Sequence, residues 1–120
     1  MSKATVLFYA PAPVPYASQL LQLCAIQGLK LRTLGDGALE SKLSDLAQGQ
    51  AAPGEEPSGA SLPEPILIFC GLNERQLDRL LSALRRNRVS VLKAMLTPTN
   101  SGWTLRALYE ELCQERLRLS

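Results

Sequence analysis

The chain gathers its polar, ligand-competent side chains in one short segment, residues 93–103, which reads Lys-Ala-Met-Leu-Thr-Pro-Thr-Asn-Ser-Gly-Trp. Hydroxyl and amide side chains such as those of Thr97, Thr99 and Asn100 bind ligands when a loop presents them. The segment matches no motif with an established mechanism. Part of it has a structural explanation, because Pro98 and Asn100 are residues that form turns.

The end of this segment has a second structural explanation. A helix that starts after Thr104 would use that residue as its N-cap, and Trp103 would pack on Leu108 as a hydrophobic staple. Trp103 is the only Trp of the chain. Lys93, Thr97 and Asn100 are not needed for the cap, so we interpret them, with Trp103 beside them, as candidate ligand-binding residues.

Cys70 offers a different chemistry. It ends an apolar run and precedes an expected helix N-terminus, whose dipole can lower a thiol pKa and create a reactive thiolate. The chain has no His and no C-x-x-C motif to assist such a thiol. A small enzyme or thiol-redox protein that uses Cys70 is therefore an alternative to the non-catalytic interpretation.

The same helix N-terminus is also a candidate anion site. Gly71 forms the turn, and Asn73 with Gln76 three residues later has the spacing of a capping box. A helix N-terminus can bind phosphate, although no glycine-rich phosphate motif is present. Anion or nucleotide binding is the second alternative.

The basic residues near this helix are interpreted as a solvated face and not as a nucleic-acid site, because no aromatic residue is interleaved with them. They are Arg75, Arg79, Arg85, Arg86, Arg88 and Lys93.

Strands and helices alternate along the chain. β-branched and aromatic runs predict strands at residues 5–9, 29–34, 66–70 and 89–96. Apolar residues at helical spacing predict helices at residues 16–27, 38–48, 73–87 and 104–117. Two stretches, residues 6–34 and 66–96, have the same strand-helix-strand order, but their residues do not align as a repeat.

This order predicts an α/β fold with a four-stranded, mostly parallel sheet and helices on both faces. Strands 5–9 and 66–70 lack alternation and should be central, whereas Lys30, Arg32 and Lys93 mark the other two strands as edges. Right-handed crossovers then give the strand order 2-1-3-4, with the first and fourth helices on one face and the second and third on the other. The alternative is a ferredoxin-like α+β fold, an antiparallel sheet with extra helices.

In a parallel sheet, a site is expected in the crevice at the carboxyl ends of the central strands. Tyr9 would line one side of that crevice, and Cys70, Gly71 and Asn73 the other. The segment that contains Lys93, Thr97, Asn100 and Trp103 would close it. These eight residues are the predicted ligand-binding set, and we expect no catalytic and no metal-binding residues among them.

The bulk properties set limits on the class of protein. A length of 120 residues predicts one domain, here with a flexible Pro/Gly-rich loop at residues 49–65. A net charge of +2 gives no argument for nucleic acid or membrane surfaces. The three Cys have no paired spacing, and no apolar run approaches the length of a membrane span. We therefore expect a cytoplasmic protein without a cofactor.

The C-terminal half resembles a family of small bacterial proteins of unknown function. The resemblance rests on the Phe69-Cys70-Gly71 strand end, the Leu-rich helix after it, and a Lys-x-x-x-Thr-x-x-Asn-x-x-Trp signature formed by Lys93, Thr97, Asn100 and Trp103. It covers residues 66–115 and implies a bacterial cytosolic origin. It implies no activity, substrate or catalytic residue.

The sequence thus predicts a non-catalytic domain that binds a small ligand or a protein partner. A second copy of the chain is one such partner.

Overall fold

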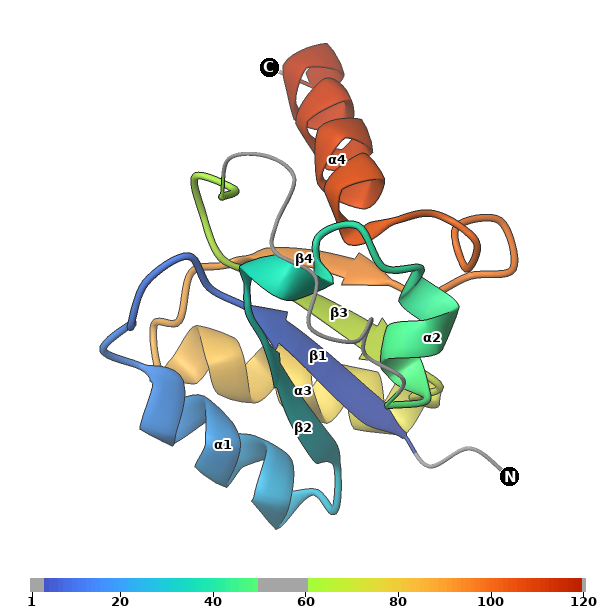
Figure 1. Cartoon of the computed structure of the whole chain (residues 1–120). Coiled ribbons are helices and arrows are strands. Elements are labelled where there is room, and N and C mark those ends of the chain that lie inside the picture. The colour runs from blue at the N-terminus through green and yellow to red at the C-terminus, as the bar shows by residue number, and fades with distance from the viewer. Residues whose placement is uncertain (1–3, 50–60, 120) are drawn as a thin grey trace.

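The structure, a computed structural model, describes residues 4–49 and 61–119 and contains one four-stranded sheet with helices on both faces (Figure 1). The strands are β1 (Thr5–Tyr9), β2 (Lys30–Leu34), β3 (Ile66–Cys70) and β4 (Leu92–Met95). The helices are α1 (Ala17–Ile26), the 3-10 turn η1 (Asp36–Ala38), α2 (Leu43–Ala47), α3 (Glu74–Arg86) and α4 (Leu105–Leu119). Residues 50–60, most of the predicted loop at 49–65, lie outside the described residues.

The sheet has the predicted strand order, β2-β1-β3-β4, but it is mixed. β1 pairs with β2 and β3 pairs with β4 in parallel, whereas the central pair, β1 and β3, is antiparallel. The prediction that β3 runs parallel to β1 is therefore wrong. The ferredoxin-like alternative fails as well, because that fold splits each βαβ unit with another strand, and here the two strands of each unit are neighbours.

Each face of the sheet has its own apolar core. On one face α1 and α3 cover β1 and β3, and the cluster contains Leu20, Cys24, Leu80 and Leu84. On the other face α2 and α4 cover the same strands, with Leu43 and Leu105 among the buried residues. Because both faces of the central strands are covered, β1 and β3 are buried along their whole length.

The predicted distribution of helices over the two faces was wrong for the same reason as the strand direction. Right-handed crossovers that lead in opposite directions along a parallel sheet place their helices on opposite faces. Here the second strand-helix-strand unit, β3-α3-β4, runs antiparallel to the first, β1-α1-β2. This reversal brings its crossover helix α3 to the same face of the sheet as α1. The antiparallel β1/β3 junction therefore brings α3 beside α1 and leaves the other face to α2 and α4.

The two halves of the chain are related by an approximate two-fold axis between β1 and β3. The central pair of the β1/β3 register is Leu7 and Ile68. Where the halves meet again, at the bridge between Lys42 and Thr104, the hydrogen bonds are reciprocal. The Leu43 N–H donates to Trp103 O, and the Leu105 N–H donates to Ser41 O.

A second reciprocal pair strengthens this relation. The Ser44 N–H donates to Ser101 O (3.0 Å), and the Arg106 N–H donates to Leu39 O (3.0 Å). Leu39 and Ser41 thus give their carbonyl groups to the start of α4, which is the reason why the predicted helix at 38–48 is reduced to η1 and α2.

The crossover helices end in the same way. At Gln27 (φ −92°, ψ 5°) and at Asn87 (φ −93°, ψ 6°) the backbone leaves the helix with almost identical angles. The next residues, Gly28 (φ 70°) and Arg88 (φ 56°), are both left-handed. Glycine adopts this conformation without steric cost, whereas Arg88 is the one non-glycine residue among those described with positive φ. Fold geometry, and not residue identity, is what the two halves share.

Candidate functional site

A groove runs between the edge strand β4 and helix α4, with a volume of about 460 Å³. β4 contributes Lys93, Ala94 and Met95, the following loop Thr97, Thr99, Asn100 and Trp103, and α4 Leu108, Glu111, Leu112 and Glu115. Four residues of the predicted ligand-binding set, Lys93, Thr97, Asn100 and Trp103, thus line one groove.

Asn100 holds the loop of the groove in shape. Its Oδ1 accepts a hydrogen bond from the Thr97 N–H (2.8 Å), and its Nδ2 donates to Met95 O (2.9 Å). Its own N–H donates to Thr97 Oγ1 (3.2 Å). The side chain is 8% exposed. Because both ends of the amide are engaged with backbone, Asn100 positions the loop and has little capacity left for a ligand.

Trp103 is fixed by its neighbours in the chain. The Thr104 hydroxyl accepts from the Ala107 N–H (3.1 Å), so Thr104 caps α4 as the sequence predicts. Trp103 packs against the core cluster that contains Leu108 while one side remains half-buried in the groove. The indole therefore contributes apolar surface to a wall with a defined position.

The polar rim of the groove carries charges of both signs. Lys93 is exposed, and its Nζ donates to Val91 O (3.1 Å) in its own strand. Glu111 and Glu115 are one helical turn apart on α4 and face the same groove. Like charges at this spacing repel each other, and no ion pair involves either carboxylate among the described side chains. Among the described side chains the rim thus carries two carboxylates and one cation, Lys93, which is bonded back to its strand.

The remaining predicted residues do not join this groove. Because β1 and β3 are antiparallel, Tyr9 pairs with Ile66, whereas Cys70 pairs with Thr5 at the opposite end of the sheet. The Tyr9 side chain is fully buried, and its hydroxyl accepts from the Leu62 N–H (3.1 Å). The predicted crevice between Tyr9 and Cys70 therefore does not exist.

Cys70 and Gly71 lie beside a smaller hollow of about 150 Å³ with Thr5, Ser44, Ala47, Gln48 and Leu96. Cys70 itself is 5% exposed. Burial raises the pKa of its thiol to about 11, opposite to the lowered pKa of a reactive thiolate. The thiol-redox alternative receives no support from this environment.

Asn73 caps α3 in the way the sequence predicts. Its Oδ1 accepts from the Gln76 N–H (2.8 Å), while Gln76 Oε1 accepts from the Asn73 N–H (2.9 Å). The capping box thus satisfies two of the backbone donors that an anion would need. This geometry favours a structural role for Asn73 over the anion-binding alternative.

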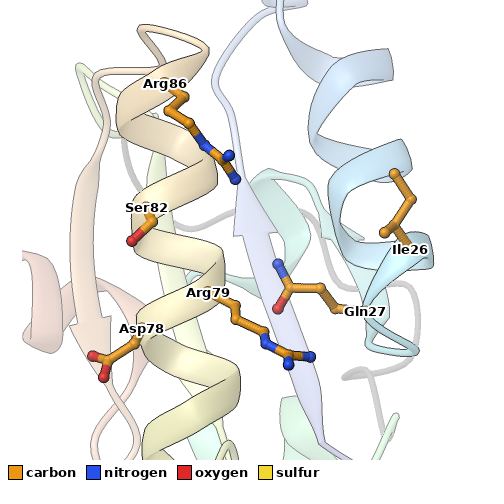
Figure 2. A pocket seen from close by; sticks show the side chains of 6 residues that line it. All are labelled: Ile26, Gln27, Asp78, Arg79, Ser82 and Arg86. Carbon is orange, nitrogen blue, oxygen red and sulfur yellow. The ribbon is translucent and has the colours of Figure 1, made fainter.

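A second, more open groove of about 630 Å³ lies between α1 and α3 (Figure 2). Figure 2 shows Gln27 and Arg79 pointing toward each other across it, with Asp78, Ser82 and Arg86 along α3. By the two-fold relation Gln27 and Arg79 correspond to Asn87 and Gln19, which form a hydrogen bond of 2.6 Å. Exposed, flexible side chains form most of its walls, so this groove is less well built for a ligand than that beside β4.

Sequence reasoning missed the α4 wall of the site. Leu108 was predicted only as the staple partner of Trp103, and Leu112, Glu111 and Glu115 were not among the predicted ligand-binding residues. The available signal was that Glu111 and Glu115, one helical turn apart, flank the apolar stripe that contains Leu108 and Leu112. Only the packing of α4 against the end of β4 turns that stripe into a groove wall.

The described part of the chain contains no cluster of three His, Cys, Asp or Glu side chains that could hold a metal ion. Within residues 4–49 and 61–119, no helix has the length and apolar character required to cross a bilayer.

A search of curated proteins gave no match. Residues 65–119 match the family model DUF3783, a domain of unknown function. This match confirms that the C-terminal half resembles a domain of unknown function, and it begins with β3 and ends with α4. The part of the chain that matches this family model is therefore the second half of the two-fold fold, which carries the groove between β4 and α4.

Proposed function

We propose that the protein is a non-catalytic binding domain whose ligand or partner occupies the groove between β4 and α4. The observation that carries this proposal is the convergence of Lys93, Thr97, Asn100 and Trp103 with the apolar and acidic side chains of α4 on one groove. Apolar surface with a few fixed polar groups is the usual composition of a binding site.

The chemistry of the groove fits binding better than catalysis. Lys93 and Asn100 are engaged with backbone, and the described walls contain neither a thiol nor a nucleophile-base pair. The chain has no His, and Cys70 lies outside the groove.

We also propose that the domain works in a reducing compartment, the bacterial cytosol. Support comes from the resemblance of the Lys93–Trp103 signature to small bacterial proteins and from three unpaired thiols, at Cys24, Cys70 and Cys113.

The lone Trp makes the proposal testable. A ligand that enters the groove should change the fluorescence of Trp103, because the indole lines its wall. A panel of small metabolites and a random 12-residue peptide library are screened by thermal shift and phage selection, and each hit is titrated while Trp103 emission is recorded.

We expect at least one hit to shift the emission and to lose about tenfold or more in affinity with Thr97→Val, as loss of a hydrogen bond in a desolvated site predicts. Thr33→Val, an exposed hydroxyl on the opposite edge strand, is the matched control and should leave affinity unchanged. Hits that never perturb Trp103, or that bind both variants equally, would refute the groove as the site.

A further inference from the structure

We propose that the occupant of the groove is an extended peptide segment of a partner protein, which adds as a strand to the edge of β4 and places a Lys or Arg beside Glu111 and Glu115. This inference deepens the proposed function and rests on it. Strand addition supplies affinity through main-chain hydrogen bonds, and side-chain pockets supply specificity.

The backbone of β4 has the groups that strand addition requires. The Leu96 N–H donates to Phe69 O, so the even-numbered residues of this strand direct their backbone groups toward β3. Successive residues of a strand alternate in direction. The N–H and C=O of Lys93 and the N–H of Met95 therefore point away from β3, toward an edge beside which the described residues form no further strand.

The far end of this edge is closed by Asn100. Its Nδ2 donates to Met95 O, the next outward carbonyl along β4. The open edge is thus a short row of three backbone groups that ends at the loop. A row of this length fits a short peptide segment better than an unlimited sheet extension.

The side chains along the groove give the peptide an apolar surface. Met95 is 46% exposed, one of the large apolar side chains that the described surface leaves open. Its neighbours Ala94 and Leu96 pack on the face that α2 and α4 cover, so the Met95 side chain lies on the opposite face of β4. On the α4 face, Trp103, Leu108 and Leu112 line the groove. An alternating peptide strand beside β4 would bury apolar side chains against both surfaces.

The charges of the rim specify the peptide further. Glu111 and Glu115 repel each other at helical spacing, and neither has a partner among the described side chains. Lys93 is bonded to its own strand and does not neutralise them. A cationic side chain between the two carboxylates would relieve this repulsion, which is why the peptide should carry Lys or Arg.

The other edge of the sheet provides an internal comparison. β2 is the two-fold counterpart of β4, and it carries two charged side chains of the kind that protects edge strands, Lys30 and Arg32, whereas β4 carries one, Lys93. Its following helix, α2, ends at Ala47, whereas α4 continues to Leu119. Among the described residues, β4 is the edge strand that itself carries an exposed large apolar side chain, Met95, and that is followed by a helix as long as α4.

A second copy of this chain is a poorer occupant. Antiparallel pairing of two β4 edges about a two-fold axis perpendicular to the sheet would keep both α4 helices on one face of the joined sheet. Glu111 and Glu115 of both copies would then lie on the same face of the joined sheet, and like charges across an interface disfavour association.

The test uses the full chain and peptides from a random 12-residue phage library, with affinities measured by fluorescence anisotropy of synthetic peptides. We expect the selected peptides to alternate apolar residues and to include Lys or Arg. Met95→Pro should weaken binding about tenfold, because it removes an outward N–H without touching the β3/β4 ladder. Met95→Ala separates the loss of the side chain from the loss of the N–H.

Two controls define the specificity of the effect. The Lys30 N–H donates toward β1, so alternation directs the Thr33 N–H outward, and Thr33→Pro on β2 should leave affinity unchanged. The double variant Glu111→Gln, Glu115→Gln should reduce affinity about tenfold for peptides with Lys or Arg and should reduce the dependence of binding on salt.

The outcomes separate this inference from the proposed function. Small-molecule hits that shift Trp103 emission, in the absence of selected peptides or of any Met95→Pro effect, would preserve the groove as a site and overturn the peptide proposal. A dimer that sedimentation equilibrium detects and that Met95→Pro dissociates would overturn it in favour of a second copy. Peptides that bind without perturbing Trp103 would contradict both proposals.

Discussion

Asn100 illustrates how a single side chain can appear functional in sequence and prove structural in the fold. Its amide ties Thr97 N–H and Met95 O together within one loop, and it is buried. At the corresponding place in the first half the chain has Ala38, also buried, so the second half alone uses an amide there. The residue makes the loop rigid, and a rigid loop positions Thr97 and Trp103 for binding.

Replacement of Asn100 by Ala should destabilise the protein by about 2–3 kcal/mol, because it leaves a partly buried backbone N–H and C=O without partners. Urea denaturation measures the change in the free energy of unfolding. Thr99→Ala, on the exposed surface of the same loop, should change it by less than about 0.5 kcal/mol. Equal effects of the two substitutions would show that the amide hydrogen bonds do not hold the loop.

At the scale of elements, the ends of the two crossover helices matter most for positioning β2 and β4. Gly28 and Arg88 occupy the same left-handed position after α1 and α3, and the following N–H groups, of Leu29 and Val89, bond back to Cys24 O and Leu84 O. These bonds explain why β4 begins at Leu92 and not at residue 89 as predicted. In the sequence, Gly28 marks the C-terminal stop of the first helix, whereas the equivalent stop at Arg88 has no such marker.

Arg88→Gly should stabilise the protein by about 0.5–1 kcal/mol, because glycine adopts a positive φ without a Cβ clash. Chemical denaturation of the variant provides the measurement. Arg85→Gly, placed inside α3, is the matched control and should destabilise by about 1 kcal/mol, since glycine is a poor helix former. A loss of stability in Arg88→Gly would mean that the Arg88 side chain contributes more than its backbone costs.

At the scale of the whole molecule, the two-fold relation gives the sheet two separate apolar cores, one on each face. Cys24 lies in one core and Cys70 in the other, and burial raises the pKa of each thiol to about 11 from an ordinary 9.0. Burial first, then hydrogen bonds with Cys113 and Glu64, also raises the pKa of Tyr109. Both cores therefore require these groups to remain protonated.

This requirement predicts a loss of stability at alkaline pH. Below pH 9 the thiols are protonated in the folded and unfolded states, so their contribution is constant. Between pH 9 and about 11 the unfolded thiols ionise while the folded ones remain protonated, which lowers the free energy of unfolding by about 1.4 kcal/mol per pH unit for each thiol.

This loss is measured by comparing melting temperatures at about pH 7 and about pH 10, which lie on either side of the ordinary thiol pKa. Cys24→Ala should show a smaller drop than the natural chain. Leu20→Val, a core change on the same helix without a titratable group, should lower both melting temperatures and keep the full drop. An unchanged drop in Cys24→Ala would exclude the thiol as its cause.

Much of the candidate site was predictable because its signals are local. The capping box at Asn73, the N-cap at Thr104 and the gathering of Lys93, Thr97 and Asn100 near Trp103 depend on residues a few positions apart. The wall formed by α4 was not predictable, because Leu112 and Glu111 meet β4 only through packing between elements far apart in the chain.

By itself the sequence determined which strands are central and which are edges, and hence the strand order β2-β1-β3-β4. Uninterrupted apolar runs must be covered on both faces, whatever the direction of their neighbours. The tertiary structure alone decided that β3 runs against β1, because the connection from Ala47 to Ile66 is long enough to enter the strand from either end. That one direction removed the predicted crevice, placed α3 beside α1, and left the functional surface at the edge of β4.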